Sequence, residues 1–215
     1  SAECPKGLLE VKGEILIERQ IRQLQEAGID DITIVVGYKA EMFQYLATKY
    51  GVEIVNNEDY YRYNNTSSII RVLDRLSNTY ICSSDNYFPN NVFLEEPTQS
   101  FYSALYADGV TGEYCLSVDV NDNIINVAVG GADSWYMVGH VFFNKEFSEK
   151  TPNYLEKDLI INPIHSPLNI SNLLDEASED LKLDINEKNQ FSNSFEILSH
   201  HSATKLVLSS WSEKA

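Results

Sequence analysis

A short apolar run, residues 79–83, leads into Asp85, and small or polar residues surround that carboxylate. In an open α/β sheet, ligands bind at the carboxyl ends of the strands. A carboxylate placed there can hold Mg²⁺, which takes one or two protein carboxylates together with substrate phosphates and water. An aspartate in the turn after a strand is also common in α/β proteins, so position alone leaves both interpretations open.

Two further segments could contact a phosphate group. Lys6 precedes a predicted helix and could act as a point charge on a phosphate, although most lysines in such places are solvated surface charges. Residues 64–68 read Asn-Asn-Thr-Ser-Ser and open another predicted helix. Such a run offers caps, free N–H groups and the positive end of the helix dipole. An anion site and a simple cap are equally compatible with it.

Two aromatic side chains and an acid lie together at Asp133, Trp135 and Tyr136. This combination suits a quaternary ammonium group, which binds the faces of aromatic rings. Adjacent residues of a strand point to opposite faces, so we expect one of the two aromatic side chains to belong to the core. His140, in the middle of a predicted strand, is interpreted as a core histidine rather than a catalytic base.

The composition indicates one globular domain that binds neither nucleic acid nor anionic membranes. The chain has 215 residues and a formal net charge of −16, whereas a nucleic-acid partner calls for a basic face. A lysine and a divalent cation can still reverse the field inside one cleft. No stretch approaches the roughly 20 apolar residues of a membrane span, and the first residues lack a signal-peptide pattern. Cys4, Cys82 and Cys115 form no disulfide or metal pattern, so we expect free thiols and a cytoplasmic location.

Alternating helix and strand patterns position the candidate residues. The helical patterns cover residues 15–27, 40–50 and 67–76, and the strand patterns cover residues 32–36, 52–55 and 79–83. This rhythm predicts an α/β, Rossmann-like, three-layer fold with a mixed, mostly parallel central sheet. Right-handed crossovers would bring three neighbouring parallel strands to one edge, ending near Gly37, Asn56 and Asp85.

The pattern changes after residue 112. Three antiparallel strands are predicted, over residues 113–120, 124–129 and 136–143. We expect a core domain over residues 1–150 and a divergent C-terminal segment over residues 151–215 that packs on the core or extends it. Within that segment, residues 169–181 have the pattern of an acidic amphipathic helix.

Five segments, in order and at similar spacing, resemble the nucleotidyltransferases that activate phosphocholine with CTP, particularly the bacterial branch often fused to choline kinase. The segments are residues 5–9, 32–38, 63–69, 79–88 and 130–143. The resemblance implies a Rossmann-like nucleotidyltransferase fold, transfer of CMP from CTP to phosphocholine, and Mg²⁺ as the cofactor. It also implies a choline kinase, fused or separate, as a partner.

The same resemblance assigns roles to individual residues. Lys6 matches the catalytic lysine that contacts the phosphates, and Asp85 matches the catalytic aspartate that binds the metal. The residues implied for the nucleotide site are Lys6, Gly37, Tyr38, Asn64, Asn65, Ser67 and Ser68. The residues implied for the acceptor site are Tyr87, Asp133, Trp135 and Tyr136.

Two departures from the family pattern bear on activity. Family members carry a strand and a Gly-rich loop directly before the Pro-Lys motif, and the sequence given starts at Ser1 without them. They also carry a second metal-binding aspartate late in the chain, where the nearest match here has Leu198. We therefore expect weak or no turnover by this exact polypeptide. Two alternatives stay open: a relative of the sugar-1-phosphate nucleotidyltransferases, and a non-catalytic nucleotide-binding or protein-interaction module.

Overall fold

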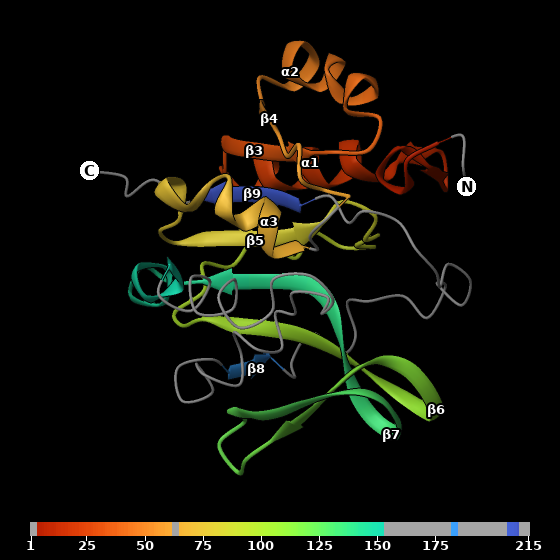
Figure 1. Cartoon of the computed structure of the whole chain (residues 1–215), viewed down its shortest axis with the longest axis vertical. Coiled ribbons are helices and arrows are strands. Elements are labelled where there is room, and N and C mark those ends of the chain that lie inside the picture. Colours follow the sequence, from red (N-terminus) through yellow and green to blue (C-terminus); the bar gives the residue numbers. More distant parts are fainter. Residues whose placement is uncertain (1–3, 62–64, 153–181, 185–205, 211–215) are drawn as a thin grey trace.

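A mixed seven-stranded sheet forms the centre of the molecule (Figure 1). The computed structural model describes residues 4–61, 65–152, 182–184 and 206–210. The strand order is β4-β3-β9-β5-β7-β6-β8. The strands are β3 (Asp31–Val36), β4 (Glu53–Asn56), β5 (Thr79–Ser83), β6 (Phe101–Val118), β7 (Ile124–Phe143), β8 (Lys182–Asp184) and β9 (Leu206–Ser210). The helix expected over residues 169–181 lies outside the described residues, and the domain division at residue 150 stays a prediction.

The helices are shorter and more broken than the sequence patterns predict. The helices are α1 (Leu16–Glu26), α2 (Tyr45–Tyr50) and α3 (Asn65–Ile70), with the 3-10 turns η1 (Lys6–Leu8), η2 (Ala40–Phe43) and η3 (Leu73–Arg75). A small hairpin, β1 (Glu10–Val11) with β2 (Glu14–Ile15), precedes α1. The expected helix over residues 40–50 is therefore divided at Gln44, and the one over residues 67–76 is divided between α3 and η3. None of the helices within the described residues is long and apolar enough to span a membrane.

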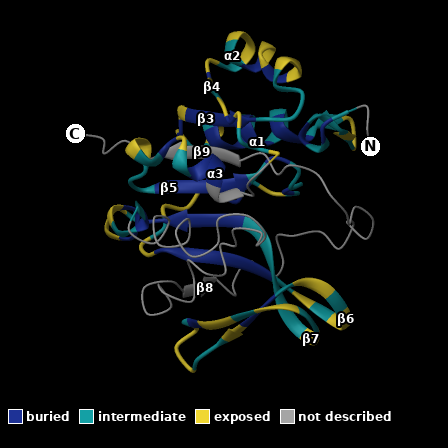
Figure 2. Ribbon diagram, viewed as in Figure 1, coloured by how far each residue is buried: buried dark blue, intermediate teal, exposed yellow. Residues whose placement is uncertain are grey.

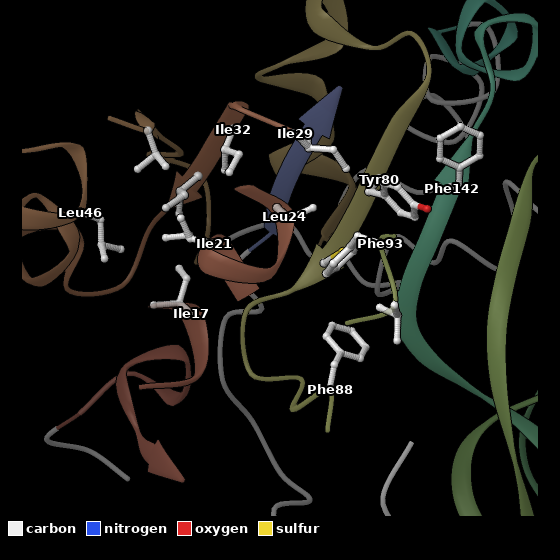
Figure 3. Close-up of a cluster of buried hydrophobic side chains, with 14 of the residues drawn as sticks. Ile17, Ile21, Leu24, Ile29, Ile32, Leu46, Tyr80, Phe88, Phe93 and Phe142 are labelled. Atoms are coloured by element: carbon white, nitrogen blue, oxygen red, sulfur yellow. The ribbon is translucent and has the colours of Figure 1, made fainter. Parts of the chain in front are cut away.

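Side-chain alternation along the strands builds the three layers. Ile34 of β3 and Tyr80 of β5 lie in one core cluster, on the face that α1 covers. Val35 and Ile81, one residue further along each strand, lie in the other cluster, on the face that α3 covers. This is the period of two expected for strands buried on both faces. Figure 3 shows the cluster on the α1 side, where Ile17 and Ile21 lie toward Leu46, and Leu24 lies toward Tyr80 and Phe93.

β9 occupies the place between β3 and β5. It pairs antiparallel with β3 through Thr33↔Leu208 and antiparallel with β5 through Ile81↔Leu208. The expectation that the strands ending near Gly37, Asn56 and Asp85 are neighbours is therefore wrong for β5, although β3 and β4 do pair in parallel. Because β3 and β5 are both antiparallel to β9, they still run in the same direction, and their carboxyl ends share one edge of the sheet. The sheet is mixed, as expected, but among the described residues more pairs are antiparallel than parallel.

β6 and β7 leave the sheet together as a long twisted arm (Figure 2). The strands expected over residues 124–129 and 136–143 are both parts of β7, because the chain bends at Gly130, which has φ +75°, without leaving the strand. Cys115 pairs with both Ala128 and Tyr136, so the outer parts of the two strands fold back on each other. The arm is exposed at its far end, where Val110 is 91% exposed.

Replacing Leu208 by proline tests whether β9 joins the two halves of the sheet. Proline removes a backbone N–H and does not fit a central strand, so we expect a loss of about 3 kcal/mol or more in the free energy of unfolding. Leu183→Pro is the matched control, because among the described strands β8 lies at the sheet edge and pairs with β6 alone. Urea unfolding measures both, and equal losses would contradict a central place for β9.

Glu18 of α1 connects that helix to α2. Its carboxylate accepts hydrogen bonds from the Tyr45 hydroxyl (2.8 Å), the Lys49 ammonium (2.7 Å) and the Tyr50 hydroxyl (2.8 Å). Burial alone would raise the pKa of Glu18, but these hydrogen bonds outweigh it and hold the pKa below its ordinary value. The ionised carboxylate therefore contributes stability at neutral pH.

We expect Glu18→Gln to lower the free energy of unfolding at pH 7. The difference from the parent protein should stay constant down to the ordinary pKa of 4.5 and then shrink as the pH falls through the lowered folded-state value. Urea unfolding between pH 7 and pH 3 measures it. Glu26→Gln, on the same helix with a more exposed carboxylate paired to Arg22, should cost little at any pH. A difference for Glu18→Gln that does not change with pH would contradict the role of its charge.

Candidate functional site

A tight turn at the end of β5 presents the Asp85 carboxylate to solvent. The Asn86 N–H donates to the Ser83 carbonyl at 3.2 Å and closes the turn. The Asp85 side chain is 33% exposed, and its Oδ2 lies 3.9 Å from Nζ of Lys6, whose side chain is 19% exposed. A cation and a carboxylate therefore stand side by side at the carboxyl edge of the sheet, as the sequence predicted for a phosphate site.

The absence of a side chain at Gly7 allows this approach. Gly7 is buried in η1, and a Cβ there would lie 2.6 Å from Oγ of Ser84. Only glycine therefore lets the segment that carries Lys6 lie directly on the turn that carries Asp85.

The other side of the turn is tied to β7. Nδ2 of Asn86 donates to the carbonyls of Val138 (2.8 Å) and Gly139 (3.1 Å). Gly139 has φ +64°, and a Cβ at this position would lie 2.3 Å from Oγ of Ser83. β7 therefore bends closely around the end of β5.

Asn57, just after β4, fixes the start of α3. Its Nδ2 donates to Oγ of Ser67 (2.8 Å) and Oγ of Ser68 (3.1 Å), and all three side chains are buried. These contacts anchor the helix on the strand. Asn65 is the first residue of α3, whereas Asn64 lies outside the described residues.

Gly37 follows β3 and packs against an aromatic side chain. A Cβ at Gly37 would lie 2.5 Å from Cβ of Tyr60. Glycine at this position therefore allows Tyr60 to pack directly against the chain at the carboxyl edge of the sheet. Tyr61, which is 67% exposed, meets Tyr60 edge to face. Nζ of Lys39 lies over the ring of the neighbouring Tyr38, 5.4 Å from its centroid.

Tyr87, two residues beyond Asp85, already has cationic partners within the protein. The Arg19 guanidinium lies 4.7 Å and Nζ of Lys12 lies 5.2 Å from the centroid of its ring. Arg19 also donates from Nε to the Phe88 carbonyl at 2.9 Å. The ring of Tyr87 therefore serves in part to hold the β1–β2 hairpin and α1 against the loop after β5.

The second group of predicted residues lies along the arm, with Asp133 near its exposed end. Asp133 has φ +50°, and its Oδ1 accepts the Gly109 N–H at 2.8 Å. Trp135 packs partly against the core on the α3 side and meets Tyr106 edge to face at 5.2 Å, so the expectation that one aromatic is part of the core is confirmed. Tyr136 is half-buried, and burial, together with the nearby charge of Glu113, raises its pKa.

The two groups are separate along β7. Tyr136 is three residues from Gly139, which corresponds to about 10 Å of strand. The bonds from Asn86 to Val138 and Gly139 nevertheless connect the Asp85 turn to the strand that carries Trp135 and Tyr136.

Asp85 stands without a cluster of other metal ligands. In the part of the chain that the structure describes, no group of three His, Cys, Asp or Glu side chains is placed to hold a metal ion. The Leu198 segment lies outside the described residues. His140 is fully buried, with Nδ1 2.8 Å from Oγ of Ser103, and is the core histidine that the sequence predicted.

The chain is similar to several known proteins. A family model described as a MobA-like NTP transferase domain matches residues 2–115. The choline-phosphate cytidylyltransferase of Streptococcus pneumoniae is 37% identical over 153 residues, which cover 71% of this chain and 67% of the relative. The chain belongs to the MobA-like NTP transferase family. The 2-aminoethylphosphonate cytidylyltransferase of Lancefieldella rimae is 34% identical over 155 residues, which cover 70% of this chain and 63% of that relative. The chain thus spans about two thirds of the length of these curated relatives.

Solved structures confirm the fold of this NTP transferase. The CTP:phosphocholine cytidylyltransferase of Streptococcus pneumoniae superposes with a TM-score of 0.77 at 32% identity, covering 85% of this chain and 81% of that one. The inositol-1-phosphate CTP transferase of T. maritima superposes with a TM-score of 0.62 at 14% identity, covering 85% and 77% of the two chains. The second likeness shows the Rossmann-like nucleotidyltransferase fold alone.

Several residues that organise the site of this NTP transferase were not singled out in the sequence. They are Arg19, Gln20, Asn57, Tyr60 and Asn86. Gln20 gave one readable signal, since it is a polar residue inside the apolar stripe of α1. Asn57 and Asn86 act through contacts between distant segments, which no local pattern reveals.

Gly7→Ala tests the close approach of the Lys6 segment to the Asp85 turn. The added methyl group would overlap Oγ of Ser84, and overpacking of this kind costs about 1–3 kcal/mol in the free energy of unfolding. Gly112→Ala is the control, because a Cβ there meets nothing within 4 Å and should change stability by less than about 0.5 kcal/mol. Urea unfolding of both variants measures the difference, and equal effects would contradict the tight contact.

Proposed function

We propose that this protein transfers the cytidylyl group of CTP to phosphocholine and releases pyrophosphate. The observation that carries the proposal is the pair of Lys6 and Asp85, 3.9 Å apart at the carboxyl end of β5. The likeness to a choline-phosphate cytidylyltransferase at 37% identity supports the choice of nucleotide and acceptor.

The reaction needs no general base. An oxygen of the acceptor phosphate attacks the α-phosphorus of CTP, and a new P–O bond forms. The bond from the α-phosphorus to the oxygen that bridges to the β-phosphorus breaks, and this oxygen leaves with the electron pair as part of pyrophosphate. A phosphomonoester is largely dianionic at pH 7, because its second pKa is about 6, so no side chain has to remove a proton. The buried position of His140 is compatible with this reaction.

Lys6 would bind the triphosphate. Its ammonium group carries three N–H donors and lies beside Asp85 in the free protein, where the two charges offset each other. In the complex, the lysine would donate to phosphate oxygens and stabilise the negative charge that develops on the leaving pyrophosphate.

The Asp85 carboxylate fits a divalent cation of the Mg²⁺ type. It is a partly exposed oxygen ligand at the sheet edge, and among the described residues it belongs to no group of three or more His, Cys, Asp or Glu side chains placed to hold a metal ion. Mg²⁺ sites commonly combine one or two carboxylates with substrate phosphates and water. When bound, the cation would neutralise charge on the triphosphate.

The acceptor side rests on the aromatic residues of the arm. Tyr106 and Trp135 meet edge to face there, with Asp133 beside them, and such groups suit a quaternary ammonium. The 34% identity to a 2-aminoethylphosphonate cytidylyltransferase favours a second candidate, the same transfer to an aminoalkyl phosphonate.

Cys4, Cys82 and Cys115 form no disulfide with one another, which suits a reducing cytoplasm as the location of the reaction. A choline kinase would supply the phosphorylated acceptor. Its presence, fused or separate, stays a prediction.

Pyrophosphate release in the presence of Mg²⁺, CTP and phosphocholine tests the proposal. We expect Asp85→Asn and Lys6→Met each to reduce the rate on the order of 100-fold or more, because each removes a charge that faces the triphosphate. Asp30→Asn, an exposed acid directly before β3 and at the opposite end of that strand from Gly37, is the control and should leave the rate unchanged.

The choice of acceptor is read in the same assay. A higher rate with 2-aminoethylphosphonate than with phosphocholine would replace the proposed acceptor and keep the reaction. Binding of CTP without pyrophosphate release from either acceptor would contradict the transfer itself.

A further inference from the structure

Two glutamines interrupt the apolar face of α1 where it covers the sheet. Gln20 is 0% and Gln23 is 2% exposed, in a helix whose other buried residues are mostly Leu and Ile. Burying a carboxamide costs free energy unless hydrogen bonds compensate. Each glutamine here donates two hydrogen bonds to backbone carbonyls, which lie at the end of β5 or in the loop that follows it.

The two acceptors of Gln20 flank Asp85. Its Nε2 donates to the Ser83 carbonyl at 2.9 Å and to the Asn86 carbonyl at 2.9 Å. Both hydrogens of one NH₂ group therefore hold the backbone on either side of the candidate metal ligand. Two carbonyl acceptors also fix which way the amide points, because its oxygen could not replace the nitrogen there.

The side chain of Asn86 holds the same turn from the side of β7. Nδ2 of Asn86 donates to the carbonyls of Val138 and Gly139 of β7. The Asp85 turn is thus tied to α1 on one side and to β7 on the other. Oε1 of Gln20 has no hydrogen-bond partner among the described residues, so the side chain acts here as a donor.

We propose that Gln20 is a positioning residue for Asp85. The inference rests on the proposed function, in which the carboxylate binds a divalent cation together with the triphosphate. A ligand on a turn is useful only if the turn is held within about 0.5 Å of its working position. Two hydrogen bonds from a fully buried side chain restrict the backbone on both sides of Asp85 in this way. Substituting a residue that holds a metal ligand in place typically lowers metal affinity or activity about 10- to 100-fold.

Gln23 provides a matched control within the same helix. It is the same residue type, it is equally buried, and its Nε2 also donates to two carbonyls, those of Phe88 and Asn90 at 3.1 Å each. Its acceptors lie three and five residues beyond Asp85. If the glutamines only stabilise the fold, the two should be interchangeable in their effect.

The experiment compares Gln20→Met with Gln23→Met in the whole chain. Each substitution keeps the length of the side chain and removes both donors. We expect the two variants to lose similar thermal stability. We expect the Mg²⁺ concentration for half-maximal CTP binding, measured by calorimetry, to rise about 10- to 100-fold for Gln20→Met and less than about 3-fold for Gln23→Met.

Amide hydrogen exchange gives a second readout that needs no ligand. The Asn86 N–H, which donates to Ser83, should exchange faster in Gln20→Met and keep its protection in Gln23→Met. Equal changes in both variants, in exchange and in Mg²⁺ dependence, would overturn the positioning role.

The exchange measurement also separates the two proposals. If the parent protein shows no Mg²⁺-dependent CTP binding, the proposed function fails. If the Asn86 N–H then exchanges faster in Gln20→Met but not in Gln23→Met, the result would still support the inference that Gln20 restrains the turn. Unchanged Asn86 exchange in Gln20→Met would refute that inference. If Gln20→Met does not fold, Gln20→Asn takes its place, because it keeps a buried amide that is one methylene too short to reach both carbonyls. Unchanged Asn86 exchange and Mg²⁺ dependence in that variant would overturn the inference.

Discussion

The pairing of β9 with both β3 and β5 is the constraint on which the rest of the structure depends. Without a strand in that place, β3 and β4 would form one small sheet and β5 with β7 another. The candidate site needs both parts, because Gly37 follows β3 and Asp85 follows β5. A strand that pairs antiparallel on both sides leaves β3 and β5 pointing the same way. The pairing of one strand on both of its sides therefore keeps a common edge for groups that come from distant parts of the chain.

The site at that edge is built mostly from contacts to backbone atoms. Gln20 and Asn86 donate to backbone carbonyls. Gly7 and Gly139 have no side chain, so the segments that carry them can lie directly against Ser84 and Ser83. Such contacts fix the backbone path and leave the side chain of Asp85 free to carry charge at the surface. Rigidity and exposure are thus divided between neighbouring residues: the turn is held from inside, and the carboxylate faces outward.

The sequence predicted the parts of this structure that depend on local patterns. The runs of β3 and β5, the apolar stripe of α1 and the place of Asp85 at a strand end follow from side-chain periodicity alone. Lys6 and Asp85 were expected to serve one site, and the structure brings them together. The position of β9 could not be predicted, because its pairing joins residues about 175 positions apart in sequence (208 − 33 = 175). A short strand carries no pattern that selects its partners or its direction.

The aromatic residues show a different limit of sequence reasoning. A tyrosine or tryptophan near an acid suits a cationic ligand, but the same ring face also suits a cation of the protein itself. For Tyr87, the structure has the second arrangement, since Arg19 and Lys12 lie over its ring. The resemblance assigned Tyr87 to the acceptor site, and residue type alone could not identify its cationic partners, because they come from α1 and the β1–β2 hairpin.

The bend of β7 at Gly139 connects the two halves of the proposed reaction. On one side of this residue, β7 pairs with β5, and on the other it continues into the arm that carries Trp135 and Tyr136. The left-handed backbone at Gly139 (φ +64°) and its contact with Ser83 mean that the bend and the end of β5 fit together as one unit. A change in the direction of the arm would therefore disturb the same backbone contacts that hold the Asp85 turn. The turn that carries Asp85 and the strand that carries Trp135 and Tyr136 therefore meet at Gly139, which is three residues, or about 10 Å of strand, from Tyr136.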